Sequence, residues 1–416
     1  MTGTKKPHKV QRIVAIVLVA AMLAGVIIVD RTRVGLYSGM YEDSLTYAYL
    51  SETMECFSYG WVRWLGYVLG THFSDEQSDS GRYRRACVNV AEEDFSEAAE
   101  WLAAMTASQT QRSDEQNAQL YLQLACARSL SGDASGAVEA ASGAARFAPE
   151  DVRTQDMYYQ FSLVAGDSAN AAAALANYAQ LTADASLYDE IADLYLDAEQ
   201  YEESGRFYTL SIEANGADQR RYYLRGTCRM LLGQYQDAIE DFSNSDMEGS
   251  LYSKGICEMA LGDFAQAQRS FETSIERGEQ VGDSQQMLAV CKLETGEYAQ
   301  AQRLLEQYLQ DGGNYEQIAY YLGTARAMQE DYEGAIEDFD AAVEAGIFAQ
   351  ESLFAGAQCR YSIGRYQEAA ERFEQCVQEG IQTAQSQYYL GLSLVAIGES
   401  DRAAEALLEA LETDQE

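Results

Sequence analysis

The chain is 416 residues long and strongly acidic, with 66 Asp and Glu against 29 Lys and Arg and a net charge of −37. Its length exceeds one ordinary hydrophobic core, so we expect several domains or a repeat array. The charge argues against a nucleic-acid partner, because phosphate binding depends on clustered Lys and Arg. With 2 prolines and 2 histidines in the whole chain, an all-α fold is favoured, and multi-histidine metal sites and Ser/His/Asp triads are disfavoured.

The N-terminal end predicts a membrane anchor. Residues 1–12 carry four basic side chains, and residues 13–29 form an unbroken apolar run at the short end of what spans a membrane as a helix. More positive charge precedes the run than follows it, so we expect residues 1–12 to stay in the cytoplasm and the rest of the chain to lie outside the cell membrane. One alternative is a signal peptide cleaved at small residues such as Ala20, Ala21 and Ala24, and another is a soluble core helix.

Residues 30–81 differ in composition from both neighbouring regions. They are rich in aromatic side chains, include an apolar stretch over 61–69, and end in a polar segment, 74–81, that predicts a loop. We interpret this region as a linker and an N-terminal cap that covers the first repeat. An aromatic patch resting at the membrane surface is the alternative.

From residue 82 to residue 416 the chain repeats one pattern: Gly, an acidic or polar residue, an aromatic turn residue and, three positions later, Ala. The turn residue is aromatic in all but three units, and the successive turn residues are Phe95, Ala134, Ser168, Tyr201, Tyr235, Phe264, Tyr298, Tyr332, Tyr366 and Ser400. Most intervals between them are close to 34 residues, and helical periodicity precedes and follows each turn. The sequence therefore predicts about ten helical hairpins.

Two further positions recur in nearly every unit. A small residue such as Gly323 lies nine positions before the turn residue, where it would let two antiparallel helices approach closely. A bulky residue such as Phe339 lies seven positions after the turn residue, and we expect it to face the neighbouring hairpin. The shorter interval after Tyr235 predicts a truncated second helix in that unit.

At these four positions the pattern resembles the tetratricopeptide repeat. The resemblance implies a right-handed superhelical solenoid whose concave surface is lined by the first helix of each hairpin. It also implies that the fifth residue of each unit, and the twelfth, point into that groove. The partner-binding residues predicted in this way are Tyr223, Tyr252, Tyr320, Phe354, Tyr361 and Tyr388. The alternative is that these rings fill the hairpin interface, because tyrosine is common in such repeats.

Two other residue sets bear on function. Asp189, Asp193 and Asp197 lie four residues apart, so they would form an acidic stripe that either binds a cation or basic segment or is simply a solvated face. The 8 cysteines show no CxxC spacing and read as small buried core residues without disulfides. Free thiols fit poorly with an oxidising exterior, which counts against the topology given above.

The sequence shows no nucleophile or phosphate-binding motif, so we expect no enzyme activity, no metal and no cofactor. The expected function is a membrane-anchored scaffold that binds a protein or peptide partner. One alternative is a receptor whose repeats face the cytosol. Another is an enzyme or cation-binding protein that uses residues 34–81 or the acidic stripe.

Overall fold

The computed structural model describes residues 50, 54 and 78–413, and all regular structure in this part is helical. The chain divides into two compact units, Met1–Asn215 and Gly216–Glu416. The helices of the first unit are α4 (Asp79–Ala91), α5 (Phe95–Thr106), α6 (Asp114–Leu130), α7 (Ala134–Phe147), α8 (Val152–Ala165), α9 (Ser168–Thr182), the 3-10 turn η1 (Ala185–Leu187), α10 (Tyr188–Asp197) and α11 (Tyr201–Asn215). The helices of the second unit are α12 (Gln219–Leu231), α13 (Tyr235–Ser243), α14 (Ser250–Ala260), α15 (Phe264–Arg277), α16 (Val281–Glu294), α17 (Tyr298–Gln310), α18 (Tyr315–Ala327), α19 (Tyr332–Ala345), α20 (Ala349–Ser362), α21 (Tyr366–Gln378), α22 (Thr383–Ile397) and α23 (Ser400–Thr413).

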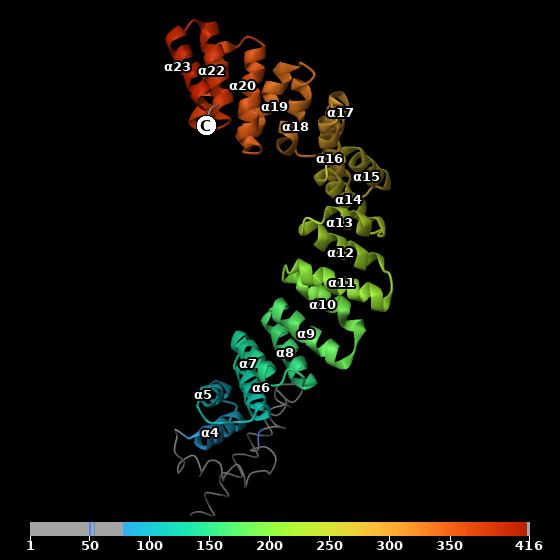
Figure 1. Ribbon diagram of the computed structural model, residues 1–416, viewed down its shortest axis with the longest axis vertical. Coiled ribbons are helices and arrows are strands. Elements are labelled where there is room, and N and C mark those ends of the chain that lie inside the picture. The colour runs from blue at the N-terminus through green and yellow to red at the C-terminus, as the bar shows by residue number, and fades with distance from the viewer. Residues whose placement is uncertain (1–49, 51–53, 55–77, 414–416) are drawn as a thin grey trace, which may run out of the picture. The chain divides into compact units, whose positions relative to one another are not determined.

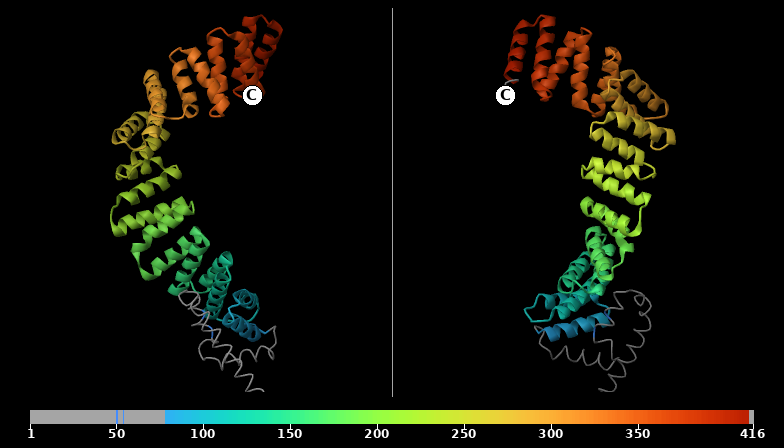
Figure 2. Two further views of the ribbon diagram at one scale, coloured as in Figure 1. Left: turned by 180° about the vertical axis from the view of Figure 1, so that it is seen from behind. Right: turned by 45° about the vertical axis from the view of Figure 1, so that its right-hand side comes forward.

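Consecutive helices pair into hairpins, each with an even-numbered first helix and an odd-numbered second helix. Within each unit, Figures 1 and 2 show the hairpins side by side in chain order. A single hairpin leaves an apolar face that the next hairpin covers, so stability in such an array is shared between neighbours. The predicted all-α fold and helical hairpins are confirmed for the described residues. The right-handed sense of a superhelix stays a prediction.

The repeated Gly-acidic-aromatic pattern is the turn between the two helices of a hairpin. Gly262 has a left-handed φ of 78°, which ends α14, and the Asp263 side chain accepts a hydrogen bond from the Gln266 N–H at 3.1 Å to begin α15. Glycine adopts this conformation without steric cost, and aspartate is a favoured N-cap residue. Glu330 occupies the equivalent position of another hairpin with a φ of 64°, although it is not glycine.

The small and bulky positions pack on each other inside one hairpin. A Cβ atom on Gly255 would lie 2.7 Å from the Phe271 ring, and one on Gly323 would lie 3.0 Å from the Phe339 ring. Close approach at the small residue is therefore confirmed. The bulky residue faces the next hairpin, as expected, and also packs within its own. Phe339 covers Gly323 of its own hairpin and also packs with Cys359 of the next one, because one large ring fills the space between three helices.

Two boundaries also bear on the sequence predictions. The segment 74–81 is not a loop throughout, because α4 begins at Asp79 and the Ser78 hydroxyl caps it by accepting a hydrogen bond from the Gly81 N–H. The truncated second helix after Tyr235 is confirmed, since α13 has 9 residues.

The cysteines are core residues, as predicted. The free, buried cysteines of the described part are Cys87, Cys126, Cys228, Cys257, Cys291, Cys359 and Cys376. Burial raises the pKa of the Cys257 and Cys359 thiols to about 11, because a thiolate is poorly solvated in an apolar interior.

The predicted anchor, residues 13–29, lies outside the described residues. Across residues 78–413, no helix combines the length and apolar character that crossing a membrane requires. Most of the predicted cap, 30–81, is also outside the described part, and its two described residues before 78, Leu50 and Met54, are fully buried.

Candidate partner-binding surface

The fifth-position rings of four hairpins in the second unit each pack on the bulky residue of their own second helix. The pairs are Tyr223–Phe242, Tyr252–Phe271 and Phe354–Phe373, with ring centroids 5.8 Å apart, and Tyr320–Phe339, 6.2 Å apart. One side of each ring therefore contributes to hairpin packing. Tyr223, Tyr252 and Tyr320 are only half-buried, so part of each ring is open to solvent.

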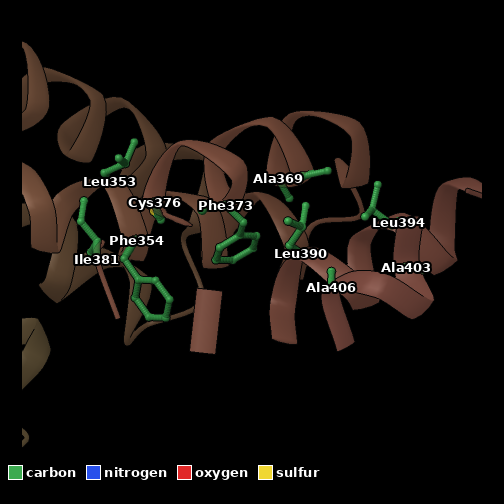
Figure 3. Close-up of a cluster of buried hydrophobic side chains, with 12 residues drawn as sticks. Leu353, Phe354, Ala369, Phe373, Cys376, Ile381, Leu390, Leu394, Ala403 and Ala406 are labelled. Atoms are coloured by element: carbon green, nitrogen blue, oxygen red, sulfur yellow. The ribbon is translucent and has the colours of Figure 1, made fainter. Parts of the chain in front are cut away.

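Phe354 differs from the three tyrosines and corrects the prediction made for it. It is 6% exposed and belongs to a buried cluster with Leu353, Phe373 and Leu390 (Figure 3). The Tyr389 ring lies 6.3 Å from it on another side. Phenylalanine has no hydroxyl to keep in water, so complete burial suits it. It is a core residue with little surface to offer a partner.

Tyr361 and Tyr388 are brought together by a residue that the sequence prediction did not include. Tyr389 lies 5.8 Å from Tyr361 and 5.5 Å from Tyr388 between ring centroids. Tyr361 is half-buried and also contacts Tyr366, whereas Tyr388 is 49% exposed. Of the six predicted residues, Tyr388 presents the most open ring.

A second aromatic group lies one hairpin earlier. Phe348, in the loop before α20, stacks on Tyr320 with ring centroids 4.9 Å apart and meets Tyr321 edge-on at 5.4 Å. Phe348 is 42% exposed. Sequence reasoning missed it because it belongs to neither helix of the repeat pattern. Its only sequence signal is its place two residues after Gly346, which ends α19 with a left-handed φ of 71°.

Exposed apolar side chains also mark the C-terminal ends of the first helices. Leu231 is 52% exposed, Leu261 49%, Met328 54% and Val395 57%. Each lies three to five residues before the turn residue of its unit. The twelfth and thirteenth positions of the repeat pattern could have revealed most of them. These side chains and the partly open rings of Tyr223, Tyr252, Tyr320, Tyr361 and Tyr388 make up what we call the first-helix surface.

Carboxylates flank the tyrosines of the first-helix surface. Burial raises the pKa of Tyr320, and the nearby charges of Glu351 and Glu294 raise it further. Burial and the charge of Asp283 act on the pKa of Tyr252 in the same direction. All three carboxylates are exposed, so this part of the surface combines aromatic faces with negative charge.

Other charged groups are used inside the hairpins. Asp241, 1% exposed on its side chain, pairs with Arg225 at 2.6 Å and Arg229 at 2.7 Å. Asp338 pairs with Arg326 at 2.9 Å and accepts a hydrogen bond from the Tyr315 hydroxyl at 2.5 Å. Burial raises the pKa of Asp338 to about 6. These pairs join first and second helices and are structural.

One carboxylate of the predicted acidic stripe on α10 also makes a contact inside its own hairpin. Asp193 accepts a hydrogen bond from the hydroxyl of Tyr208, which is fully buried on α11. Among the described residues, no group of His, Cys, Asp and Glu is arranged to hold a metal ion. The stripe therefore supplies at least one contact within its own hairpin.

Comparisons with known proteins agree on the repeat. Family models described as tetratricopeptide repeat match residues 258–328 and 354–416. No curated protein matches the chain. YrrB, described as a TPR protein with an unusual peptide-binding site, is 23% identical over 39% of this chain and 86% of its own, with a TM-score of 0.35.

Two further solved structures are similar in the same way. MamA is 19% identical over 39% of this chain and 94% of its own, with a TM-score of 0.36. The C-terminal part of a TPR repeat-containing protein from Cytophaga hutchinsonii is 16% identical over 53% of this chain and 94% of its own, with a TM-score of 0.45.

Proposed function

Because the chain is a tetratricopeptide repeat protein, we propose that it is a scaffold that binds a segment of a protein partner on its first-helix surface. The observation that carries the proposal is the set of open or partly open rings and exposed aliphatic side chains on the first helices α12, α14, α18, α20 and α22 and at their C-terminal ends, with Tyr388 49% and Met328 54% exposed. Exposed apolar groups that gather on one surface mark sites of interaction with a partner. Aromatic anchors bury a large area with little loss of conformational entropy.

The chemistry proposed is binding without catalysis. In the described part, buried carboxylates such as Asp241 and Asp338 are neutralised by arginines of their own hairpins. Such pairs hold two helices together, so these two carboxylates serve the packing of their hairpins. The open groups on the first-helix surface are rings, aliphatic side chains and solvated carboxylates, which suit recognition of a peptide.

Site-specific photocrosslinking tests the scaffold proposal. A photoreactive side chain is placed at Tyr252 and, separately, at Tyr388, with a control at Glu344, which is exposed on the second helix α19. We expect the same polypeptide to be captured from both tyrosine positions and not from Glu344. Capture from Glu344 alone, or of no polypeptide from either tyrosine position, would argue against this surface and this function.

We also propose that residues 13–29 anchor the chain in the cell membrane, with residues 1–12 in the cytoplasm and the repeats outside. The support is the apolar run and the four basic residues that precede it. Protease added to intact cells is expected to digest the repeats, and deletion of residues 13–29 to release the chain from membranes. Digestion only after lysis would favour the cytosol-facing alternative.

A further inference from the structure

Phe348 occupies a loop position where the fold does not require an aromatic side chain. Gln280 and Gln382 hold the equivalent place before α16 and α22, and all three residues have a left-handed backbone, with φ of 44°, 49° and 40° for Gln280, Phe348 and Gln382. A bulky side chain is disfavoured in this conformation. Because glutamine is found at this position in the other two loops, folding does not require the Phe348 ring, and its exposed face is available to contact a partner.

The ring is part of a compact three-ring cluster. Phe348 stacks on Tyr320 at an interplanar angle of 27° and meets Tyr321 at 66°, and the two tyrosines lie 5.4 Å apart. Tyr320 and Tyr321 are both half-buried, and Phe348 is 42% exposed. The two tyrosines thus anchor the cluster on α18, and the Phe348 ring leaves part of it open to solvent.

Exposed carboxylates of α16 and α20 lie beside this cluster. Glu351 lies in the first turn of α20, three residues after Phe348, and Glu294 is the last residue of α16. Both are exposed, and their charges add to the effect of burial in raising the pKa of Tyr320. Two basic side chains of α16 and α18 pair with other carboxylates, since Lys292 lies 3.1 Å from Glu297 and Arg326 lies 2.9 Å from Asp338. Rings with an electron-rich face beside carboxylates form a favourable environment for a cation.

The same relationship recurs two hairpins earlier. Tyr252 and Asp283 are separated by the same number of residues as Tyr320 and Glu351. Asp283 is likewise exposed, and its charge adds to the effect of burial in raising the pKa of Tyr252. The pairing of a fifth-position tyrosine with a carboxylate of the following first helix is therefore a repeated feature of this unit.

We propose that the cluster of Tyr320, Tyr321 and Phe348, together with Glu351 and Glu294, binds an arginine or lysine side chain of the partner segment. The guanidinium or ammonium group lies over the ring faces and pairs with a carboxylate, and arginine is favoured because its planar group stacks as it donates hydrogen bonds. The inference rests on the proposed scaffold function and adds that the partner is basic where it crosses α18 and α20.

Selection from a phage-displayed library of random 12-residue peptides on the full chain in detergent micelles tests this inference. Peptides rich in Arg and Lys are expected to be enriched. On Phe348→Gln, and on Glu294→Gln with Glu351→Gln, the affinity of the best basic peptide is expected to fall roughly tenfold. Glutamine in the equivalent loops indicates that Phe348→Gln folds normally, which an unchanged circular dichroism melting curve verifies. Glu344→Gln on α19 removes one exposed charge as a matched control and should leave the affinity unchanged.

The outcomes separate this inference from the scaffold function. Enrichment of neutral or acidic peptides, or basic peptides that bind the variants as tightly as the original chain, would overturn the inference while leaving a peptide-binding scaffold. Failure to enrich any peptide would also overturn the inference, and crosslinking from Tyr252 and Tyr388 would then decide the scaffold function by itself. Loss of basic-peptide binding in 1 M salt is a further expected result, because exposed charges are screened.

Discussion

Arg326 on α18 and Asp338 on α19 form an ion pair, with 2.9 Å between Nη1 and Oδ2, inside a single hairpin. The carboxylate side chain is 1% exposed, and the Tyr315 hydroxyl donates a hydrogen bond to its other oxygen. Asp241 holds the same repeat position in another hairpin and is likewise buried and paired with arginines. Removing one partner leaves a buried charge without compensation, which is more costly than the loss of the attraction itself.

Arg326→Met is therefore expected to destabilise the protein by about 3 kcal/mol at pH 7.5. Burial raises the pKa of Asp338 from 3.8 to about 6, so the folded state binds this proton more tightly than the unfolded chain does. The stability gained from that proton is present in full below pH 3.8 and is lost as the pH rises through 6. Without Arg326 the pKa rises further, and acidification to pH 5 neutralises the carboxylate. The urea midpoint of the variant relative to the original chain should therefore recover at pH 5.

An exposed pair is the control for this experiment. Arg365 and Glu333 are 41% and 65% exposed on their side chains and lie 2.7 Å apart. Glu333→Gln should change the free energy of unfolding by less than about 1 kcal/mol at either pH, because water screens the pair. An Arg326→Met variant as stable as Glu333→Gln at pH 7.5 would show that the buried pair contributes no more than a surface pair.

The hairpin turn gives a prediction of opposite sign. Glu330 has a left-handed φ of 64° at the position where Gly262 stands in another hairpin with a φ of 78°. Glu330→Gly should raise the free energy of unfolding by about 0.5–1 kcal/mol, since glycine adopts this conformation without the Cβ clash. Gly262→Ala should lower it by a similar amount, and nothing within 4 Å of the added Cβ complicates that change. Thermal melts followed by circular dichroism measure both, and a destabilised Glu330→Gly variant would contradict the argument.

The sequence predicted much of the fold because the repeat constrains several positions at once. Gly323, the turn residue Tyr332 and the bulky Phe339 each require a specific backbone or packing role, and their spacing reveals the hairpin. The start of α4 was less predictable, because Asp79 and Gly81 are poor helix formers that are helical here only with the Ser78 cap.

The candidate surface was less accessible to sequence reasoning. Tyr320 and Phe354 occupy the same repeat position, yet one is half-buried and the other is in the core because Tyr389 packs over it. Phe348 lies outside the helical periodicity, so only its contacts with Tyr320 and Tyr321 reveal its place. Burial of a given repeat position depends on which side chains the next hairpin supplies, which a single unit's pattern does not contain.

Close packing at the small position predicts a size limit. Gly255→Ala would place a Cβ 2.7 Å from the Phe271 ring, so we expect destabilisation by about 1–3 kcal/mol. Gly282→Ala, also in a helix, would place its Cβ 3.4 Å from Tyr308, an ordinary contact, and should stabilise by about 0.5–1 kcal/mol. Phe271→Leu is expected to relieve part of the Gly255→Ala penalty. Denaturation midpoints of the three variants test this, and equal effects of both alanines would refute the packing argument.

The buried thiols predict slow reaction with thiol reagents in the folded chain. Burial raises the pKa of Cys257 and Cys359 to about 11 and that of Cys291 to about 12, so little thiolate forms at pH 8. The eighth cysteine, Cys56, lies outside the described residues, so it is replaced by serine. In that variant, Ellman's reagent at pH 8 should label the remaining cysteines only as the protein unfolds in urea. The labelling rate should follow the circular dichroism transition, because opening of the hairpins exposes the sulfur atoms. Complete labelling before that transition would mean that the hairpins open locally, and the packing described for the cysteine positions would then be wrong.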